Sequence, residues 1–133
     1  MNSPAIDIKD FLLAVSGESS SDLGLTMGIN LFVAVLPETP VLATAIIDGP
    51  GPQPEPNNIR QSTIQILTRG VANGYIAAWA KIEAIVNELH AQANITINST
   101  KYIQIYKFNE ISHVGNDSKG RPIFSCTLAI KRA

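Results

Sequence analysis

The sequence has few residues of the kinds that carry redox chemistry or charge. A single cysteine among 133 residues rules out a disulfide within the chain, and a reducing compartment fits best. Charged residues make up 16%, against about 25% in an average soluble domain. The chain lacks a run of about 18 apolar residues and a basic start followed by an apolar run, so we expect neither a membrane span nor a signal peptide. So little charge in a small chain is typical of a subunit that hides surface against its neighbours.

The residues that could carry chemistry stand apart from one another. His90 and His113 have no carboxylate or cysteine at metal-ligand spacing, and we expect both to be structural. Cys126 alternates with apolar residues, which favours a buried and unreactive thiol. The stretch 48–52 (DGPGP) has glycines but no Lys-Ser/Thr pair, and its prolines remove the amide donors that a phosphate needs. We therefore predict no enzyme, no metal site and no cofactor.

Charge is unevenly spread along the chain. Residues 1–58 carry seven acids and one base, a net charge of −6, whereas residues 59–133 carry nine bases and four acids, a net charge of +5. One interpretation is a chance distribution over a solvated surface. The other is a negative patch on one subunit that meets a positive patch on the next, as a head-to-tail ring requires.

The strongest structural signal lies over residues 71–92. Large side chains there recur at steps of four and three, as on one face of a helix: Tyr75, Trp79, Ile82, Val86 and Leu89. Alanines interspersed among them add helix propensity. Ser3 followed by Pro4 starts a second, shorter helix over 4–16. Because the segments around the long helix are strand-like, we expect it to cover a sheet.

The rest of the chain is expected to form strands and one long loop. Apolar or alternating patterns predict strands over 27–36, 41–48, 58–69, 102–108 and 122–131, with a short strand or extended link at 95–97. The first two should pair as a hairpin across the turn at 37–40 (PETP). The stretch 49–58 (GPGPQPEPNN) holds four prolines and should be an exposed loop. The prediction is one α+β domain over 1–133, in the order α-βββ-α-(β)ββ, with a mostly antiparallel sheet.

Three segments in this order and spacing resemble a known family. They are IRQSTIQILTRG at 59–70, YIAAWAKIEAIVNEL at 75–89 and GRPIFSCTLAIKR at 120–132. Together they resemble the strand, Arg-Gly corner, helix and final strand of the tail terminator proteins of long-tailed bacteriophages, often labelled minor capsid or head–tail joining proteins. The resemblance covers roughly two-thirds of the chain. The apolar 27–47 segment and the proline-rich loop find no match residue by residue.

The resemblance implies a non-enzymatic structural virion protein at the junction of tail and head. Such a subunit forms a six-fold homomeric ring on the head-proximal end of the tail tube, stops tube growth and offers a docking surface to the head. Implied partners are copies of itself, the tail tube protein, a head-completion or connector protein, and genomic DNA that passes through the lumen without sequence-specific binding. Assembly would take place in the host cytoplasm, with no membrane involved. Alternatives are another neck or tail subunit (a head-completion or tail-tube protein), a small α+β binding domain, or an enzyme with a site between subunits.

The candidate contact residues are basic or lie in the proline-rich loop. They are Arg60, Arg69, Lys119, Arg121, Pro52, Pro54 and Glu55. At the strand-to-helix corner, Gly70 permits the turn and Arg69 is either solvated or paired with an acid of the neighbouring subunit. Lys119 and Arg121 flank a tight turn, where they either stay in water or touch the tube or DNA. The 49–58 loop would embrace the adjacent subunit or protrude toward a partner ring.

Overall fold

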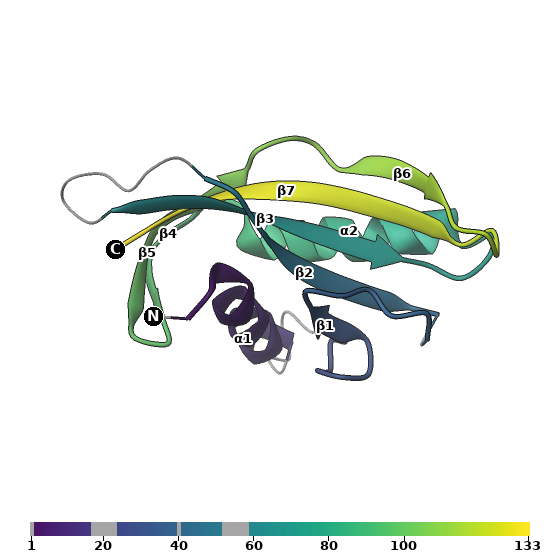
Figure 1. Ribbon diagram of the computed structural model, residues 1–133, viewed down its shortest axis with the longest axis horizontal. Helices are drawn as coiled ribbons and strands as arrows, with labels where there is room; N and C mark the ends of the chain where they lie inside the picture. The colour runs from purple at the N-terminus through teal and green to yellow at the C-terminus, as the bar shows by residue number, and fades with distance from the viewer. Residues whose placement is uncertain (1, 17–23, 40, 52–58) are drawn as a thin grey trace.

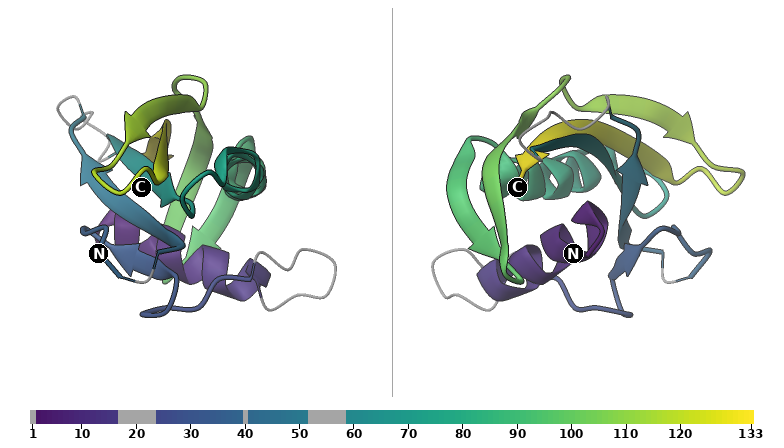
Figure 2. Two further views of the ribbon diagram at one scale, coloured as in Figure 1. Left: turned by 90° about the vertical axis from the view of Figure 1, so that its right-hand side faces the viewer. Right: turned by 60° about the vertical axis from the view of Figure 1, so that its left-hand side comes forward.

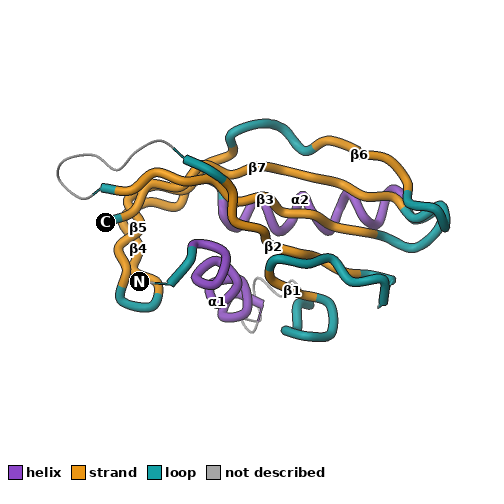
Figure 3. The backbone as a smooth tube through the Cα atoms, viewed as in Figure 1, coloured by secondary structure: helices purple, strands orange, loops and turns teal. Residues whose placement is uncertain are grey.

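A computed structural model describes residues 2–16, 24–39, 41–51 and 59–133 (Figure 1). Two helices and seven strands follow one another in the order α-βββ-α-ββββ (Figure 3). They are α1 (Pro4–Ser16), β1 (Leu31–Val33), β2 (Ala43–Gly49), β3 (Arg60–Arg69), α2 (Tyr75–Leu89), β4 (Gln92–Ile97), β5 (Thr100–Lys107), β6 (Ser112–Asn116) and β7 (Pro122–Arg132). The predicted α+β class with a mostly antiparallel sheet is confirmed.

The strands form one curled sheet in the order β1-β2-β3-β7-β5-β4, with β6 also paired to β7. β5 and β6 share one edge of β7: β6 pairs with its first residues and β5 with its last. Figure 2 shows the sheet bending around the two helices, which both lie on its concave side. The β6–β7 turn lies at one end of the molecule and the β4–β5 hairpin at the other (Figure 1).

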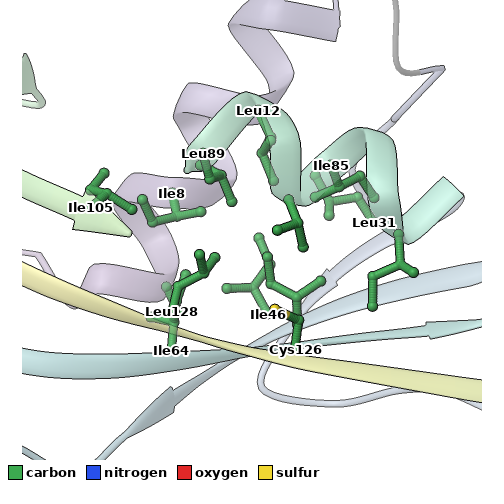
Figure 4. Close-up of a cluster of buried hydrophobic side chains, with 14 of the residues drawn as sticks. Ile8, Leu12, Leu31, Ile46, Ile64, Ile85, Leu89, Ile105, Cys126 and Leu128 are labelled. Carbon is green, nitrogen blue, oxygen red and sulfur yellow. The ribbon is translucent and has the colours of Figure 1, made fainter. Parts of the chain in front are cut away.

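One hydrophobic core fills the space between the helices and the concave face. Helix α1 contributes Ile8 and Leu12, and α2 contributes Ile85 and Leu89, all fully buried (Figure 4). Burial of each such side chain contributes about 1.5–3 kcal/mol. Strand β7 presents alternate residues to this core, as its sequence predicts: Phe124, Cys126, Leu128 and Ile130. The prediction that alternate residues of β7 form one buried face is therefore confirmed.

Polar contacts tie α1 to the sheet. The amide N–H of Ala5 donates to Asp48 Oδ1 on β2 over 2.9 Å, which satisfies one of the unpaired donors of the first helical turn. Asp7 is fully buried and accepts hydrogen bonds from the Tyr102 hydroxyl and from Asn98 Nδ2. Burial raises the pKa of Tyr102, and the Asp7 carboxylate raises it further. The helix is thereby fixed to β2, to β5 and to the β4–β5 turn.

The predicted hairpin between 27–36 and 41–48 is wrong. Only Leu31–Val33 form a strand, and this strand runs parallel to β2, with Leu31 opposite Thr44. The backbone turns just before it, at Gly28 with φ +80°, and just after it, at Ala34 with φ +71°. Apolar side chains on both faces of the segment predict a strand, but they contain no information on its direction.

The long helix is shorter than predicted and differs little in length from α1, with 15 residues against 13. A turn closed by the Gly74 N–H on the Val71 carbonyl precedes it. At its other end Ala91, with φ +67°, leads the chain directly into β4, whose six residues replace the expected short link. Three of the five stripe residues are buried, but Tyr75 is 49% exposed and Trp79 only partly covered. Ala78 and Ile85 are buried instead.

Two further differences concern the C-terminal strands. No strand was predicted at β6, because a short exposed strand has no apolar alternation to reveal it. In β5 the pairing with β7 shifts between Tyr102 and Gln104. This irregularity places Tyr102 and Ile105 on the same buried face, although strict alternation puts them on opposite faces.

Candidate assembly surfaces

Three predicted contact residues lie together at the end of the sheet that carries the β6–β7 turn. Arg69 is the last residue of β3, and Lys119 and Arg121 belong to the β6–β7 turn. With Asp117 and Glu38 they form what we call the arginine cluster. Arg60, at the other end of β3, is exposed and lies about 30 Å away by strand rise. Pro52, Pro54 and Glu55 lie outside the described residues.

Arg69 is 4% exposed, so its interpretation as a solvated side chain is wrong. Its guanidinium donates to three backbone carbonyls of the segment that follows β1: Nε to Val41 O over 3.0 Å, and one terminal nitrogen to Pro37 O over 2.5 Å and to Glu38 O over 3.1 Å. Burial lowers the pKa of Arg69, and the neighbouring charge of Arg121 lowers it further. A buried arginine thus holds a loop in place by its backbone.

Arg121 holds the same loop from the β6–β7 turn. It is 5% exposed, so it does not simply stay in water. Its Nε donates to Asp117 Oδ2 over 2.6 Å, and its terminal nitrogens donate to the backbone carbonyl and the carboxylate of Glu38. Lys119 adds an exposed ion pair of 2.7 Å to Glu38, which lowers the pKa of that carboxyl. The arginine cluster therefore joins the β6–β7 turn to the loop between β1 and β2.

The loop that the arginine cluster fixes presents apolar side chains to solvent. Val35 is 58% exposed, Val41 39% and Leu42 55%. Met27 and Ile29, before β1, are also exposed. A loop ordered by two buried guanidinium groups, with apolar side chains pointing outward, is preorganised for contact with another surface.

A groove lies beside this loop, between α2 and the ends of β2 and β3. Its volume is about 190 Å³. Its lining residues come from these elements and the segments before β1 and β2: Asn30, Leu42, Ala43, Thr44, Thr68, Arg69, Ala77, Ala78 and Lys81. The Thr44 and Thr68 hydroxyls bond each other over 3.2 Å, so each has a partner within the subunit. The groove lies on the concave side of the sheet. Thr68 of β3 is paired with the core residue Phe124 of β7, and directly paired residues of neighbouring strands point to the same face.

The convex face of the sheet carries few charges. Residues from β3, β7 and the end of β5 line two hollows there, including Gln61, Thr63, Gln65, Thr127 and Ala129. Phe108 borders both hollows and is 68% exposed. Tyr106 beside it is 40% exposed. Neither aromatic residue was among the predicted contacts, because a pattern of alternating residues does not reveal which face of an amphipathic strand meets a partner.

Within residues 1–58, each acidic side chain that the structure describes contacts another group of the same subunit. Asp7 meets Tyr102, Asp10 meets Lys9, and Glu38 and Asp48 make the contacts given above. The other three acids of residues 1–58 lie outside the described ranges. Two of the described acids pair with bases of residues 59–133 inside one copy, Glu38 with Lys119 and Arg121 and Asp7 with Arg132.

The residues considered for chemistry have structural partners. His90 Nδ1 accepts the N–H of Lys107 over 3.0 Å, and the His113 ring lies 5.2 Å from the rings of Tyr75 and Phe124. Cys126 is 1% exposed, and burial raises its pKa. Among the residues described, no three His, Cys, Asp or Glu side chains are grouped to hold a metal ion. None of the described helices is long and apolar enough to cross a membrane.

The protein is an α+β domain with a curled sheet, and exposed apolar side chains lie on both sides of that sheet. Such surfaces are typical of a subunit that assembles with other proteins. The sequence model of the bacteriophage tail terminator protein family matches residues 8–133, and the chain belongs to that family. The family resemblance noted in the sequence is thereby confirmed, and the chain is a structural tail protein of the bacteriophage kind. This family is one of structural proteins and is not a known enzyme family.

The fold is also found in a solved virion. A chain of the structure described as "Virion of native gene transfer agent (GTA) particle" is similar, with a TM-score of 0.66 and 14% sequence identity. The match covers 98% of this chain and 94% of that chain. At this identity the likeness shows the fold alone. No curated protein sequence matches the chain.

Proposed function

We propose that this protein forms a closed, six-fold ring on the head-proximal end of a phage tail tube. The ring ends tube polymerisation and provides the surface to which the filled head docks. The observation that carries this proposal is the tail terminator family match over residues 8–133. A protein that ends a tube has to bind the last tube ring on one side while offering no further tube-like surface on the other.

The surface of the subunit supports assembly into a ring. Exposed apolar side chains occur on the loop held by the arginine cluster, at the start of α2 and on the convex face of the sheet; examples are Val35, Ile76 and Phe108. Faces on opposite sides of a subunit suit heterologous contacts, which close into rings when the rotation between copies allows it. The low charge of the chain agrees with extensive contact, because charged residues are depleted at interface centres.

The proposed partners follow from this position. They are further copies of this chain, the tail tube protein, a head-completion or connector protein, and genomic DNA crossing the lumen without sequence-specific binding. The proposed location is the tail–head junction of the virion, after assembly in the host cytoplasm. Arg60, Pro52, Pro54 and Glu55 stay candidates for subunit or tube contacts. For Lys119 the exposed ion pair with Glu38 leaves contact with the tube open.

Negative-stain electron microscopy of the purified protein, alone and mixed with tube ends, tests the proposal. We expect closed rings of six copies, free or seated on one end of each tube. Long open cylinders made of this protein alone would instead identify a tube subunit. A protein that stays monomeric and never binds tube ends would contradict the proposal.

A further inference from the structure

We propose that the convex face of the sheet binds single-stranded nucleic acid, with the rings of Tyr106 and Phe108 each stacked on one unpaired base. The proposal goes beyond the ring proposed above and does not depend on it. It assigns Phe108 to a partner other than a protein, because the residues that border this ring are mainly polar. Neither helix covers this face of the sheet (Figure 2).

Side chains of three neighbouring strands form an open array on the convex face. Ala129 of β7 lies between the core residues Leu128 and Ile130, so its own side chain points away from the core. Directly paired residues of neighbouring strands point to the same face. The pairings of β7 with β3 and β5 therefore give three rows: Gln61, Lys131 and Gln104; Thr63, Ala129 and Tyr106; Gln65, Thr127 and Phe108. We call these residues the convex array.

Two aromatic rings stand next to each other in the convex array. Tyr106 and Phe108 are two residues apart along one strand, which places their Cα atoms about 7 Å apart. Tyr106 is 40% exposed and Phe108 is 68% exposed. The Phe108 backbone is fixed, because its N–H donates to the Thr127 carbonyl over 2.9 Å. Open sheets that bind single-stranded RNA stack successive bases on exposed aromatic residues of their strands, and every base has a π-face for such a ring.

Hydrogen-bonding side chains surround the two rings. Tyr106 and Phe108 border a hollow of about 210 Å³, whose other lining residues include Gln61, Gln104 and Lys131. A side-chain amide both donates and accepts, so it suits the edge of a base as well as a phosphate oxygen. No member of the convex array is an acid. Because a protein interface has a more apolar centre than this, the array favours nucleic acid as its partner.

Two basic side chains lie on the convex face at one end of the array. Lys131 belongs to the array itself. Lys101 of β5 is exposed and points to the same side, because the next residue, Tyr102, points into the core. Lys131 and Gln61 also have interactions elsewhere in the protein, so the proposal does not rest on their being free. Positive charge here attracts a phosphate backbone without reading its sequence.

Two acids beside the array are engaged within the subunit. Glu110, two residues after Phe108, pairs with Lys107 over 3.2 Å. Asp48 borders the second hollow of the convex face, and its carboxylate accepts the N–H of Ala5 over 2.9 Å. These contacts reduce the repulsion between the two carboxylates and an approaching phosphate backbone.

Fluorescence anisotropy of labelled oligonucleotides tests the proposal. We expect the purified protein to bind strands of about 12 nucleotides, a length within the range that single-strand binding sites cover. A blunt duplex of the same length should bind at least about 10-fold more weakly, because its bases are not available for stacking. DNA and RNA strands are measured side by side, and tighter binding of one of them would name the natural ligand. Affinity should fall as the salt concentration rises.

Variants of the two rings identify the binding face. F108S and Y106S should each weaken single-strand binding at least about 10-fold, as expected for the loss of one stacked base. V114S removes an exposed apolar side chain of β6 outside the array (61% exposed) and should bind like the wild type. F108W should keep the affinity, and the fluorescence of its added indole should be quenched on binding. A residue with a merely structural role would give no such quenching.

Several outcomes would overturn the proposal. Failure to bind single strands at low salt would do so, as would F108S and Y106S that bind like the wild type. Equal affinity for the duplex would leave phosphate attraction without stacking. Loss of ring assembly in F108S with unchanged binding would make the array a protein interface. Rings on tube ends without single-strand binding overturn this inference alone, whereas binding by a protein that forms no rings overturns the proposed function alone.

Discussion

Substitution of Gly70 by alanine tests how closely α2 packs on the sheet. A Cβ atom at Gly70 would lie 2.7 Å from the Ala78 Cβ, 3.2 Å from the Gly74 carbonyl oxygen and 3.4 Å from Pro122 Cγ. The backbone of Gly70 is itself held, because its N–H donates to the Pro122 carbonyl over 3.0 Å. The glycine is needed here for close approach of the helix, and its φ is not in the left-handed region.

Two opposing effects set the magnitude. A glycine-to-alanine change in a permitted conformation stabilises by about 0.4–1 kcal/mol, because the unfolded chain loses freedom. Forcing a methyl group into a packed contact costs about 1–3 kcal/mol. The overlap with Ala78 is severe enough that packing should dominate, so we expect G70A to lower the free energy of unfolding by about 1–2 kcal/mol. Urea denaturation followed by circular dichroism measures this directly.

A double-mutant cycle identifies the cause. A78G removes the methyl group that G70A strikes, at a cost of about 1–2 kcal/mol from lost burial and helix propensity. In G70A/A78G the clash is absent, so the double variant should be more stable than the sum of the single effects predicts, by about 1 kcal/mol or more. G120A, at φ +73°, is the control, because a Cβ atom there would meet no atom within 4 Å, so its backbone strain should add to A78G independently. Strict additivity in the G70A cycle would refute the close-packing argument.

Three further predictions concern stability. Ile85→Ala should cost about 2–5 kcal/mol, whereas Trp79→Ala should cost less, because Trp79 is only partly buried; equal losses in urea denaturation would contradict this ranking. Arg121→Met should lower the free energy of unfolding by about 2–4 kcal/mol, because the carboxylate of Asp117 and the carbonyl of Glu38 lose their hydrogen-bond donor. An unchanged melting temperature would show that the arginine cluster does not fix the loop. The raised pKa of Tyr102 contributes stability that is fully present below the ordinary pKa of 10.0 and is lost as pH rises above it. Tyr102→Phe should therefore flatten the loss of stability at alkaline pH, and urea denaturation at several pH values that shows the same alkaline loss in the variant would contradict this.

The parts of the fold with a strong period were predictable. β7 buries every second residue, and α2 buries Ile82, Val86 and Leu89 as their spacing predicts. In both cases the hydrophobic repeat matches the geometry of the element, so sequence alone reveals the buried face. Tyr75 and Trp79 fit the same repeat and pack edge-on against Phe124 of β7, but Tyr75 stays 49% exposed and Trp79 is only partly buried.

Features set by distant contacts were not predictable. The parallel direction of β1 follows from backbone turns at Gly28 and Ala34, and a left-handed alanine has no clear sequence signal. The buried state of Arg69 depends on carbonyls about 30 residues earlier in the chain. Its neighbours in sequence, Thr68 and Gly70, give no sign of that loop. The residues that form the candidate contact surfaces could therefore be identified only from the three-dimensional structure, although the family resemblance was visible in the sequence.

Tube length measured by electron microscopy tests the central claim most directly. Tail tube subunits are polymerised with increasing amounts of this protein, and the ends of each tube are imaged. A ring that ends polymerisation should shorten the tubes in proportion to its amount and appear as a six-fold cap on one end only. Tubes of unchanged length with bare ends, or incorporation of this protein along the tube wall, would contradict the assignment.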